Sequence, residues 1–564
     1  MQPSSDHNGS AAPGGGALRR WGPVAGIVAV LAVVAAVVLM GGDDDETSPD
    51  TSDTTATTSG GAPEGAISFS RAEAEGLDVT FADTCDQETG RLAMPYYFAP
   101  ECYANVDDNG GATAPGVTAE EIKVVVYVAP ETDPILDFIT GPIANDDTPA
   151  QIEATYQGFT DMFNAYMQTY GRTVKLEFLH GSGTSDDEVA ARADAVKAME
   201  EMGAFAVWGG PVLSNAWTQE IKARGGVCIG CPALDDQAPS VFTVAPSADQ
   251  TRAFMVEYVV KKLAGKPAEH AGQPDFVSKE RVFGHLWIDT GSADAQQGAE
   301  DLKQMLADEG VELAEQIGYE LNPGTLQEQA STIIARLKEA GVTSVILGGD
   351  PIAPKTFTEV AADQDYHPEW IMGTATLQDV TAFGRTYDQE QWSHAFGFSY
   401  LTARVATGLG APDVLYEWWT GTLAPADDTV GVLWPNPGTF FAGVQAAGPN
   451  LTAESFRDGL FSFEIDDPAI TQPSINYGDT GLWDFTDYSG IDDVTEIWWD
   501  PTAQGDDELR RAGTGMYRYV NGGKRYLVGD LPTDTVLFDE AGTVTIYDEI
   551  PAAEAPPDAP PPQR

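Results

Sequence analysis

The stretch AFAVWGGPVLSNAWTQEIKARGGVCIG, residues Ala204–Gly230, decides the fold. Its first part, Ala204–Trp208, is uniformly apolar and predicts a buried strand. A glycine-proline break follows, then Val212–Ala223 with the pattern of a helix, and Val227–Ile229 begins a second apolar run. A strand, a glycine turn, a helix and another strand predict a βαβ unit of a parallel sheet.

The turn inside this unit is a candidate ligand site. Ligands of open α/β sheets sit at the carboxyl ends of strands, and the start of a helix offers free backbone N–H groups to a polar ligand. Gly210, Ser214 and Asn215 occupy that position. We therefore expect them to contact a small molecule, with plain helix capping as the alternative for Ser214 and Asn215.

The same alternation of strands and helices occurs twice along the chain. Residues 117–265 form the first run and residues 280–395 the second, separated by a polar linker. Two successive runs predict two parallel-sheet lobes rather than one large sheet. Residues 396–530 are expected to return to lobe 1 and to add further elements, and the Pro- and Ala-rich residues 531–564 to be mostly disordered.

The chain begins with a targeting segment. Residues 1–23 are predicted to be disordered, residues 24–40 to form a transmembrane signal anchor, and residues 41–65 to form a disordered acidic linker rich in Thr and Ser. The apolar run would span about 26 Å as a helix, just enough for a bilayer core. Arg19 and Arg20 precede it and acids follow it, which indicates a single-pass anchor in the cell membrane with the C-terminal domain extracytoplasmic. A cleaved signal peptide is the alternative.

Cysteine usage agrees with export. An even number of cysteines outside the cytoplasm predicts disulfides, here Cys85 with Cys102 and Cys228 with Cys231. The first pair would staple a small section, residues 66–116. A redox-active C-x-x-C normally begins a helix, whereas this one ends a strand and runs into a proline. A zinc site is the remaining alternative.

The charge of the chain excludes several classes of function. A net charge of −57, from 87 acids and 30 bases, argues against nucleic acid as a partner, because phosphate binding needs clustered Lys and Arg. The acids predict a well-solvated surface, and a calcium-binding role is the alternative, although no run has the spacing of a calcium loop. No nucleotide-binding or hydrolase motif is present either. We therefore expect a binding protein without cofactor or metal, not an enzyme.

Four stretches, taken in order, resemble those of a known family. They are GVTAEEIKVVVYVA at residues 116–129, residues 204–233 around the βαβ unit, RVFGHLWIDTGSADAQQGAEDLKQML at residues 281–306, and LQEQASTIIARLKEAGVTSVILGGDP at residues 326–351. In this order they are similar to the type I periplasmic binding proteins of the branched-chain amino acid (Leu/Ile/Val) family. The resemblance covers residues from about 117 to 530, and the anchored, acidic build resembles actinobacterial members.

The resemblance implies two Rossmann-like lobes joined by a hinge, which close on a small polar ligand such as an amino acid or a related compound. It also implies delivery of that ligand to an ABC importer. The family's ligand contacts lie in the turns that follow strands. The positions of this chain that match those turns are Gly210, Ser214, Asn215, Ala233, Leu234, Ser292, Ala293 and Asp350.

Asp350 also has a physical case of its own. It follows a strand and a Gly-Gly turn and precedes a helix that starts at Ala353. A partly desolvated carboxylate there would pair with a ligand ammonium or hydroxyl group, and capping of the helix is the alternative. The sequence thus predicts a solute-binding protein with an ABC permease as a possible partner. The alternative function is an envelope-anchored sensor or interaction module that keeps the fold without transport.

Overall fold

The computed structural model describes residues 62–130, 132–143, 145–234, 236–373, 377–465, 467–534 and 536–562. The predicted anchor, residues 24–40, and its flanking segments up to residue 61 lie outside the described residues. None of the helices within these ranges has both the length and the hydropathy that crossing a bilayer requires.

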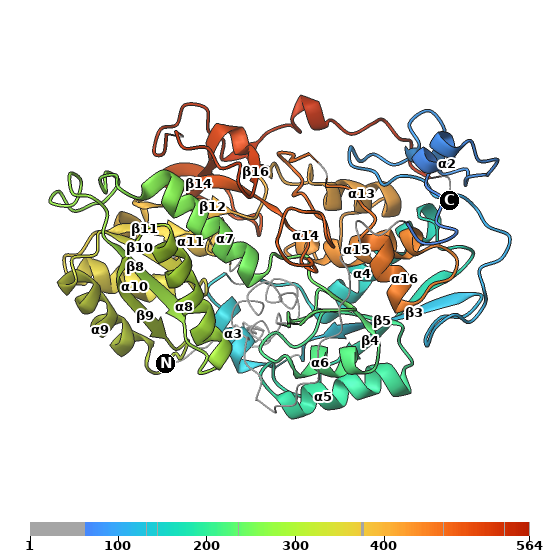
Figure 1. The fold of residues 1–564 in the computed structure, drawn as a ribbon, viewed down its shortest axis with the longest axis horizontal. Coiled ribbons are helices and arrows are strands. Elements are labelled where there is room, and N and C mark those ends of the chain that lie inside the picture. The colour runs from blue at the N-terminus through green and yellow to red at the C-terminus, as the bar shows by residue number, and fades with distance from the viewer. Residues whose placement is uncertain are drawn as a thin grey trace, which may run out of the picture.

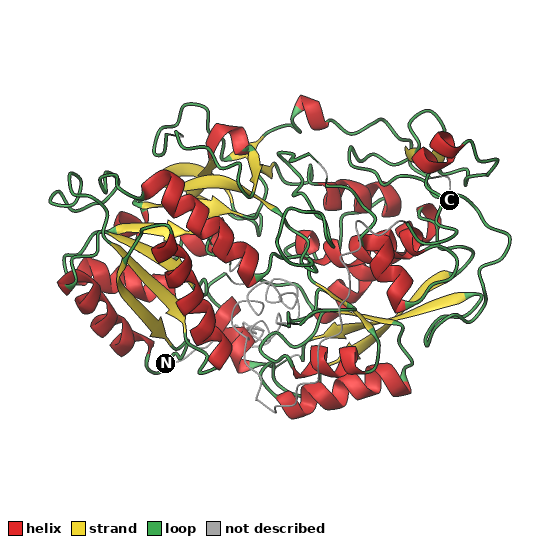
Figure 2. Cartoon of the chain, viewed as in Figure 1, coloured by secondary structure: helices red, strands yellow, loops and turns green. Residues whose placement is uncertain are grey.

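Two sheets form the centres of two lobes that lie side by side (Figures 1 and 2). The lobe 1 sheet is parallel throughout, in the order β4-β3-β5-β6-β7. Its strands are β3 (Glu121–Val128), β4 (Thr173–His180), β5 (Ala206–Trp208), β6 (Val227–Ile229) and β7 (Val241–Phe242). The predicted βαβ unit therefore supplies the neighbouring strands β5 and β6.

Helices cover both faces of this sheet because the central strand buries both sets of alternating side chains. Val125 belongs to the buried cluster on the side of α5 and α6, whereas Val124 and Val126 pack with Phe159 of α4 and Phe440 of α15. The helices of lobe 1 are α3 (Pro134–Thr140), α4 (Pro149–Tyr166), α5 (Glu188–Val196), α6 (Ala216–Ala223), α13 (Ala411–Thr420), α14 (Val430–Leu433), α15 (Pro435–Ala447) and α16 (Ala453–Leu460).

The lobe 2 sheet has the order β9-β8-β10-β11-β12-β14-β15, with β16 beside β14. It is parallel from β9 to β12 and antiparallel from β12 onward. Its strands are β8 (Phe283–Ile288), β9 (Leu313–Tyr319), β10 (Ser344–Gly348), β11 (Glu369–Met372), β12 (Ala395–Ser399), β14 (Asp493–Asp506), β15 (Ala512–Tyr519) and β16 (Arg525–Leu527). Its helices are α7 (Ala248–Tyr258), α8 (Ala293–Asp308), α9 (Leu326–Glu339), α10 (Ala353–Asp363), α11 (Thr381–Gly384) and α12 (Gln389–Trp392).

The chain after residue 395 serves both lobes. Helices α13–α16 return to lobe 1, where α13–α15 pack around α4. Residues 493–527, however, form β14–β16 in the lobe 2 sheet, whereas the sequence assigned all of residues 396–530 to lobe 1 and to additions. The apolar run in β14 predicts a strand, but its sheet is decided by antiparallel pairing with β12, which is distant in sequence.

Three crossings connect the lobes. They are residues 243–247 between β7 and α7, residues 400–410 between β12 and α13, and residues 473–492 before β14. Backbone hydrogen bonds join the first and third crossings. The N–H of Thr243 donates to the carbonyl of Tyr488 at 3.0 Å, and the N–H of Gly490 donates to the carbonyl of Thr243 at 2.8 Å.

Two buried carboxylates, Asp487 and Asp492, lie within the third crossing. The amide Nε2 of Gln250 at the start of α7 donates to both, at 3.0 Å to Asp487 and at 3.1 Å to Asp492. The indole N–H of Trp483 also donates to Asp492, at 2.7 Å. Burial raises the pKa of both carboxyl groups, and the charge of Asp492 raises the pKa of Asp487 further.

The N-terminal section packs on lobe 1. It contains α2 (Phe69–Glu75), β1 (Cys85–Asp86) and β2 (Arg91–Leu92). A disulfide joins Cys85 to Cys102, and a second joins Cys228 to Cys231, which confirms both predicted pairs. The first disulfide belongs to the same buried cluster as α4 and α15, so the section extends the core of lobe 1.

The described part of residues 531–564 packs against the rest of the chain, although the sequence predicts mostly disorder. β17 (Ile546–Tyr547) pairs in parallel with β13 (Arg404–Val405). Further on, the Glu554 carboxylate accepts hydrogen bonds from the backbone N–H of Thr471 at 2.9 Å and from its hydroxyl group. A two-residue strand and one buried carboxylate leave no periodic signal in so Pro-rich a segment.

Helix α6 begins at Ala216, later than the predicted start at Val212, because residues 212–215 form a turn. Ala223, at the end of the predicted helix, is exposed. It lies two residues beyond the buried Ile221 and therefore on the opposite side of the helix. Trp217 takes the inner position instead and is fully buried.

Replacing Gly210 with alanine is expected to lower the free energy of unfolding by about 1–3 kcal/mol, because the new methyl group would overpack the core. A Cβ at this position would lie 2.6 Å from Cδ1 of Trp217, whose indole N–H is held by the carbonyl of Gly209 at 3.0 Å. Urea denaturation measures the change. The control is Gly431→Ala in α14, where a Cβ meets open space. Equal losses in both variants would contradict the prediction.

Asp492→Asn is expected to stabilise the protein at neutral pH by roughly 1–3 kcal/mol. The pKa of Asp492 is raised on folding, so the native state binds this proton more tightly than the unfolded chain does. The resulting stability is present near pH 4 and is lost as the pH rises toward 7. The variant should therefore show a flatter dependence of unfolding free energy on pH over this range. Asp530→Asn, at an exposed carboxylate, should keep the wild-type dependence.

Candidate ligand-binding site

The predicted ligand residues of lobe 1 lie in the turns after β5 and β6. Ser214 is 2% exposed, and its hydroxyl oxygen accepts a hydrogen bond from the N–H of Ala216 at 3.2 Å. Asn215 directly precedes α6, and Gly210 is buried under Trp217. After β6, Ala233 and Leu234 are both half-buried.

In lobe 2, Ser292 caps α8 by accepting a hydrogen bond from the N–H of Ala295 at 3.1 Å, and Ala293 is exposed. Asp350 is fully buried. Its Oδ1 accepts from the N–H groups of Ile352 at 2.7 Å and Ala353 at 2.8 Å.

The second oxygen of the Asp350 carboxylate accepts from the hydroxyl of Tyr319 at 2.6 Å. Burial raises the pKa of this carboxyl group, and its four hydrogen bonds partly oppose that rise. Its contacts are those of a buried helix cap, the alternative that the sequence left open. Ligand contact by Asp350 and by the other predicted residues stays a prediction.

A cavity of about 610 Å³ lies between the lobes and beside the crossings. Lobe 1 contributes Gly230 and Cys231 after β6 and Thr243 after β7, and lobe 2 contributes Asp379 after β11 and Tyr400 after β12. The cavity thus lies at the carboxyl ends of strands from both sheets, the position where open α/β sheets bind ligands. Among the described residues that line it, Cys231 is the one that the sequence predictions name.

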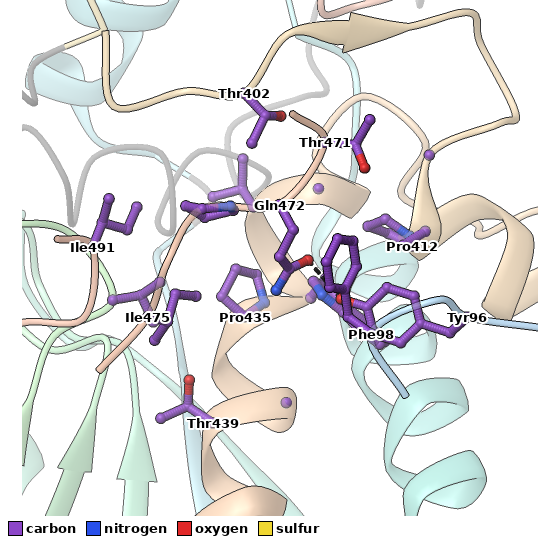
Figure 3. Close-up of a pocket in the computed structure, with 18 of the residues that line it drawn as sticks. Tyr96, Phe98, Thr402, Pro412, Pro435, Thr439, Thr471, Gln472, Ile475 and Ile491 are labelled. Atoms are coloured by element: carbon purple, nitrogen blue, oxygen red, sulfur yellow. Dashed lines mark hydrogen bonds between the residues drawn. The ribbon is translucent and has the colours of Figure 1, made fainter. Parts of the chain in front are cut away.

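The remaining walls come from segments outside the two sheets. The N-terminal section contributes residues 94–98, α15 and the residue before it contribute Trp434, Pro435 and Thr439, and the C-terminal segment contributes Ile550 and Glu554. In Figure 3, Gln472 lies between the aromatic side chains of Tyr96 and Phe98 and the aliphatic side chains of Ile475 and Ile491. The lining is therefore largely apolar, with a few polar groups set into it.

Most of these polar groups are already engaged with protein partners. The amide oxygen of Gln472 accepts from the hydroxyl of Tyr96 at 2.6 Å, and Asn436 donates to the hydroxyl of Tyr156 at 3.2 Å. Asp379 is 5% exposed, and its carboxylate accepts from the hydroxyl of Ser399. Burial raises the pKa of Asp379 to about 6.

Sequence reasoning missed these wall residues for a physical reason. They lie in segments as distant as residues 94 and 556, and most of them sit in loops or at the ends of helices. Only Gly230–Cys231 belongs to a stretch that the βαβ pattern singled out. The one signal for this wall was the glycine at position 230. A Cβ there would lie 2.3 Å from Oδ1 of Asn436, so the start of α15 must approach the end of β6 closely.

Comparison with known proteins agrees with this architecture. Residues 134–402 match a family model described as "Periplasmic binding protein". No curated protein matches the chain.

Several solved structures are similar to the chain at low identity. One is the branched-chain amino acid transporter substrate binding protein LivJ from Streptococcus pneumoniae in complex with isoleucine, with 11% identity, 71% of this chain and 100% of that chain covered, and a TM-score of 0.45. Another is a fatty acid ABC transporter substrate-binding protein from Thermomonospora curvata, with 16% identity, coverages of 72% and 94%, and a TM-score of 0.46. A third is a solute binding protein from Rhodopseudomonas palustris in complex with 3,4-dihydroxybenzoic acid, with 11% identity, coverages of 72% and 98%, and a TM-score of 0.47.

The family match and the sheet topology lead to one conclusion. The match begins in α3 and ends in the second crossing, so it includes β4–β7 of the lobe 1 sheet and β8–β12 of the lobe 2 sheet but not β3. The two lobes with their parallel sheets thus have the type I periplasmic binding protein fold, and residues 134–402 match the family model.

Proposed function

We propose that the protein is an extracytoplasmic solute-binding protein of the ABC transporter type, whose ligand occupies the cavity between the lobes. The observation that carries the proposal is the position of this cavity. It meets the carboxyl ends of strands from both lobes and touches all three crossings. A ligand held there would contact both lobes at once, which is how a two-lobe binding protein couples binding to closure.

The size of the cavity supports a ligand larger than the small polar compound that the sequence predicts. Its volume of about 610 Å³ falls within the usual range of small-molecule sites. At the volume that water occupies in the liquid, this space corresponds to roughly twenty water molecules. The ligand would therefore be a compound with an extended apolar part.

The chemistry of the lining favours binding over catalysis. The described residues that line the cavity include no histidine, serine or lysine, and Cys231 is held in a disulfide. Nucleophilic and acid–base catalysis normally depend on such groups placed in pairs. Asp379 and Glu554 are the acids of the lining, and each accepts hydrogen bonds from neighbouring protein groups.

The finer parts of this proposal rest on the sequence. We propose that residues 24–40 anchor the protein in the cell membrane and that an ABC permease receives the solute. Gly210, Ser214, Asn215, Ala233, Leu234, Ser292, Ala293 and Asp350 remain proposed contacts of the closed form. For Ser214 and Asp350 this role requires a ligand to share or replace the present hydrogen bonds to Ala216 and Tyr319.

Filling the cavity should abolish binding without unfolding the protein. Ala442 lies in α15 and lines the cavity, so Ala442→Phe would occupy part of its volume. A thermal-shift panel of amino acids, amines, alcohols and aromatic acids first identifies a ligand, and calorimetry then compares the variants. We expect at least a tenfold loss of affinity in Ala442→Phe and no change in Val189→Phe, where the valine is 81% exposed. Equal affinity in all three proteins would contradict the proposal, as would a folded protein that binds nothing in the panel.

A further inference from the structure

The charged groups in the wall of the cavity differ in how they are paired. Arg404 lies 3.5 Å from the Oε1 of Glu508, and its guanidinium also donates to the carbonyl of Asp506 at 2.5 Å. Its positive charge is thus balanced by protein groups. The two acids of the wall, Asp379 and Glu554, have no ion-pair partner among the described residues.

Asp379 accepts hydrogen bonds from neighbouring groups but forms no ion pair among the described residues. The charge of Glu508 raises the pKa of Asp379, whereas the charge of Arg525 lowers it. Arg525 is itself paired with Asp493 at 2.7 Å. Burial raises the pKa of Asp379 to about 6, so at pH 7 its carboxylate is ionised at a cost that a cation beside it would offset.

Long-range electrostatics also favour a cationic ligand. The chain has a net charge of −57, so its field attracts cations and repels anions. The apolar walls of the cavity, formed by side chains such as Trp434, Ile475 and Ile491, disfavour a ligand that is polar along its whole length. A zwitterionic amino acid would also bring a carboxylate, and Arg404, which is already paired, is the one cationic side chain among the described residues of the lining.

We infer that the ligand is an apolar molecule with one protonated amine, bound with its amine against Asp379 and its apolar body along the walls of the cavity. This inference rests on the proposed function, since it names the ligand class of the same site. A charge-assisted hydrogen bond to a buried carboxylate would fix the orientation of the amine, and burial of the body would provide most of the affinity.

Three probes with one apolar body separate the contribution of the charge from that of the body. They are 4-phenylbutylamine, 4-phenylbutan-1-ol and 4-phenylbutanoic acid, and calorimetry at pH 7.5 measures the affinity of the full chain for each. The amine should bind most tightly and the acid most weakly. Asp379→Asn should lower the affinity for the amine by about ten- to a hundredfold and should change the affinity for the alcohol by less than about threefold.

The pH dependence gives a second measurement that needs no variant. A primary alkyl amine stays protonated throughout, as lysine does, whereas Asp379 becomes neutral below a pH of about 6. Binding of the amine should therefore weaken as the pH falls from 7.5 to 5, and binding of the alcohol should not. Because the pH series uses the unmodified protein, it tests the inference even if Asp379→Asn fails to fold.

The neutral dye Nile red distinguishes this inference from the proposed function. If the dye binds and Ala442→Phe blocks it, the cavity is a binding site. The inferred ligand class is then wrong if the three probes bind equally, if the acid binds best, or if none of them binds. If neither the dye nor any probe binds the folded protein, the proposed function fails together with the inference. Preference for the amine that is lost in Asp379→Asn or at pH 5 supports both.

Discussion

The backbone hydrogen bonds between the first and third crossings fix the geometry on which the site depends. Residues 243–244 pair with residues 488–491, so the last strand of the lobe 1 sheet and the segment that enters β14 lie side by side. The buried Gln250 connects this pair of segments to α7 through Asp487 and Asp492. Because the strands of both sheets end near these crossings, the space between the lobes is bounded on one side by ordered backbone, and the cavity forms there.

Most of the fold could be predicted from the sequence, because buried parallel strands and amphipathic helices leave strong periodic signals. The strands at residues 206–208 and 227–229 lie where the pattern predicts, and the chain forms two parallel-sheet lobes, although α7, which lies within the predicted bounds of lobe 1, packs in lobe 2. The exceptions depend on pairing rather than on periodicity. The β14 strand reads as a strand from its sequence, but its place in lobe 2 follows from its register with β12. The packing of the C-terminal segment likewise depends on the short pairing of β17 with β13 and on one buried carboxylate, Glu554.

The site was less predictable than the fold. The rule that ligands bind at the carboxyl ends of strands is consistent with the position of the cavity, but it does not say which strands. The sequence favoured the ends of β5, β8 and β10, where Ser214, Ser292 and Asp350 cap local turns and helices. The cavity lies at β6, β7, β11 and β12, and its polar groups come from loops such as the one containing Asp379. Capping residues and ligand contacts have the same composition, so a single sequence does not separate them.

The walls of the cavity have a consequence for the order in which the protein matures. They combine residues 94–100 from one end of the described chain with residues 550–556 from the other. Chains fold from the N-terminus as they are made, so the lobes can form before the last wall exists. A nascent chain that reaches only residue 402 would contain the residues that match the family model but would lack α13–α16, β14–β16 and the last wall of the cavity. The cavity is therefore completed last, once residues 550–556 have joined the fold.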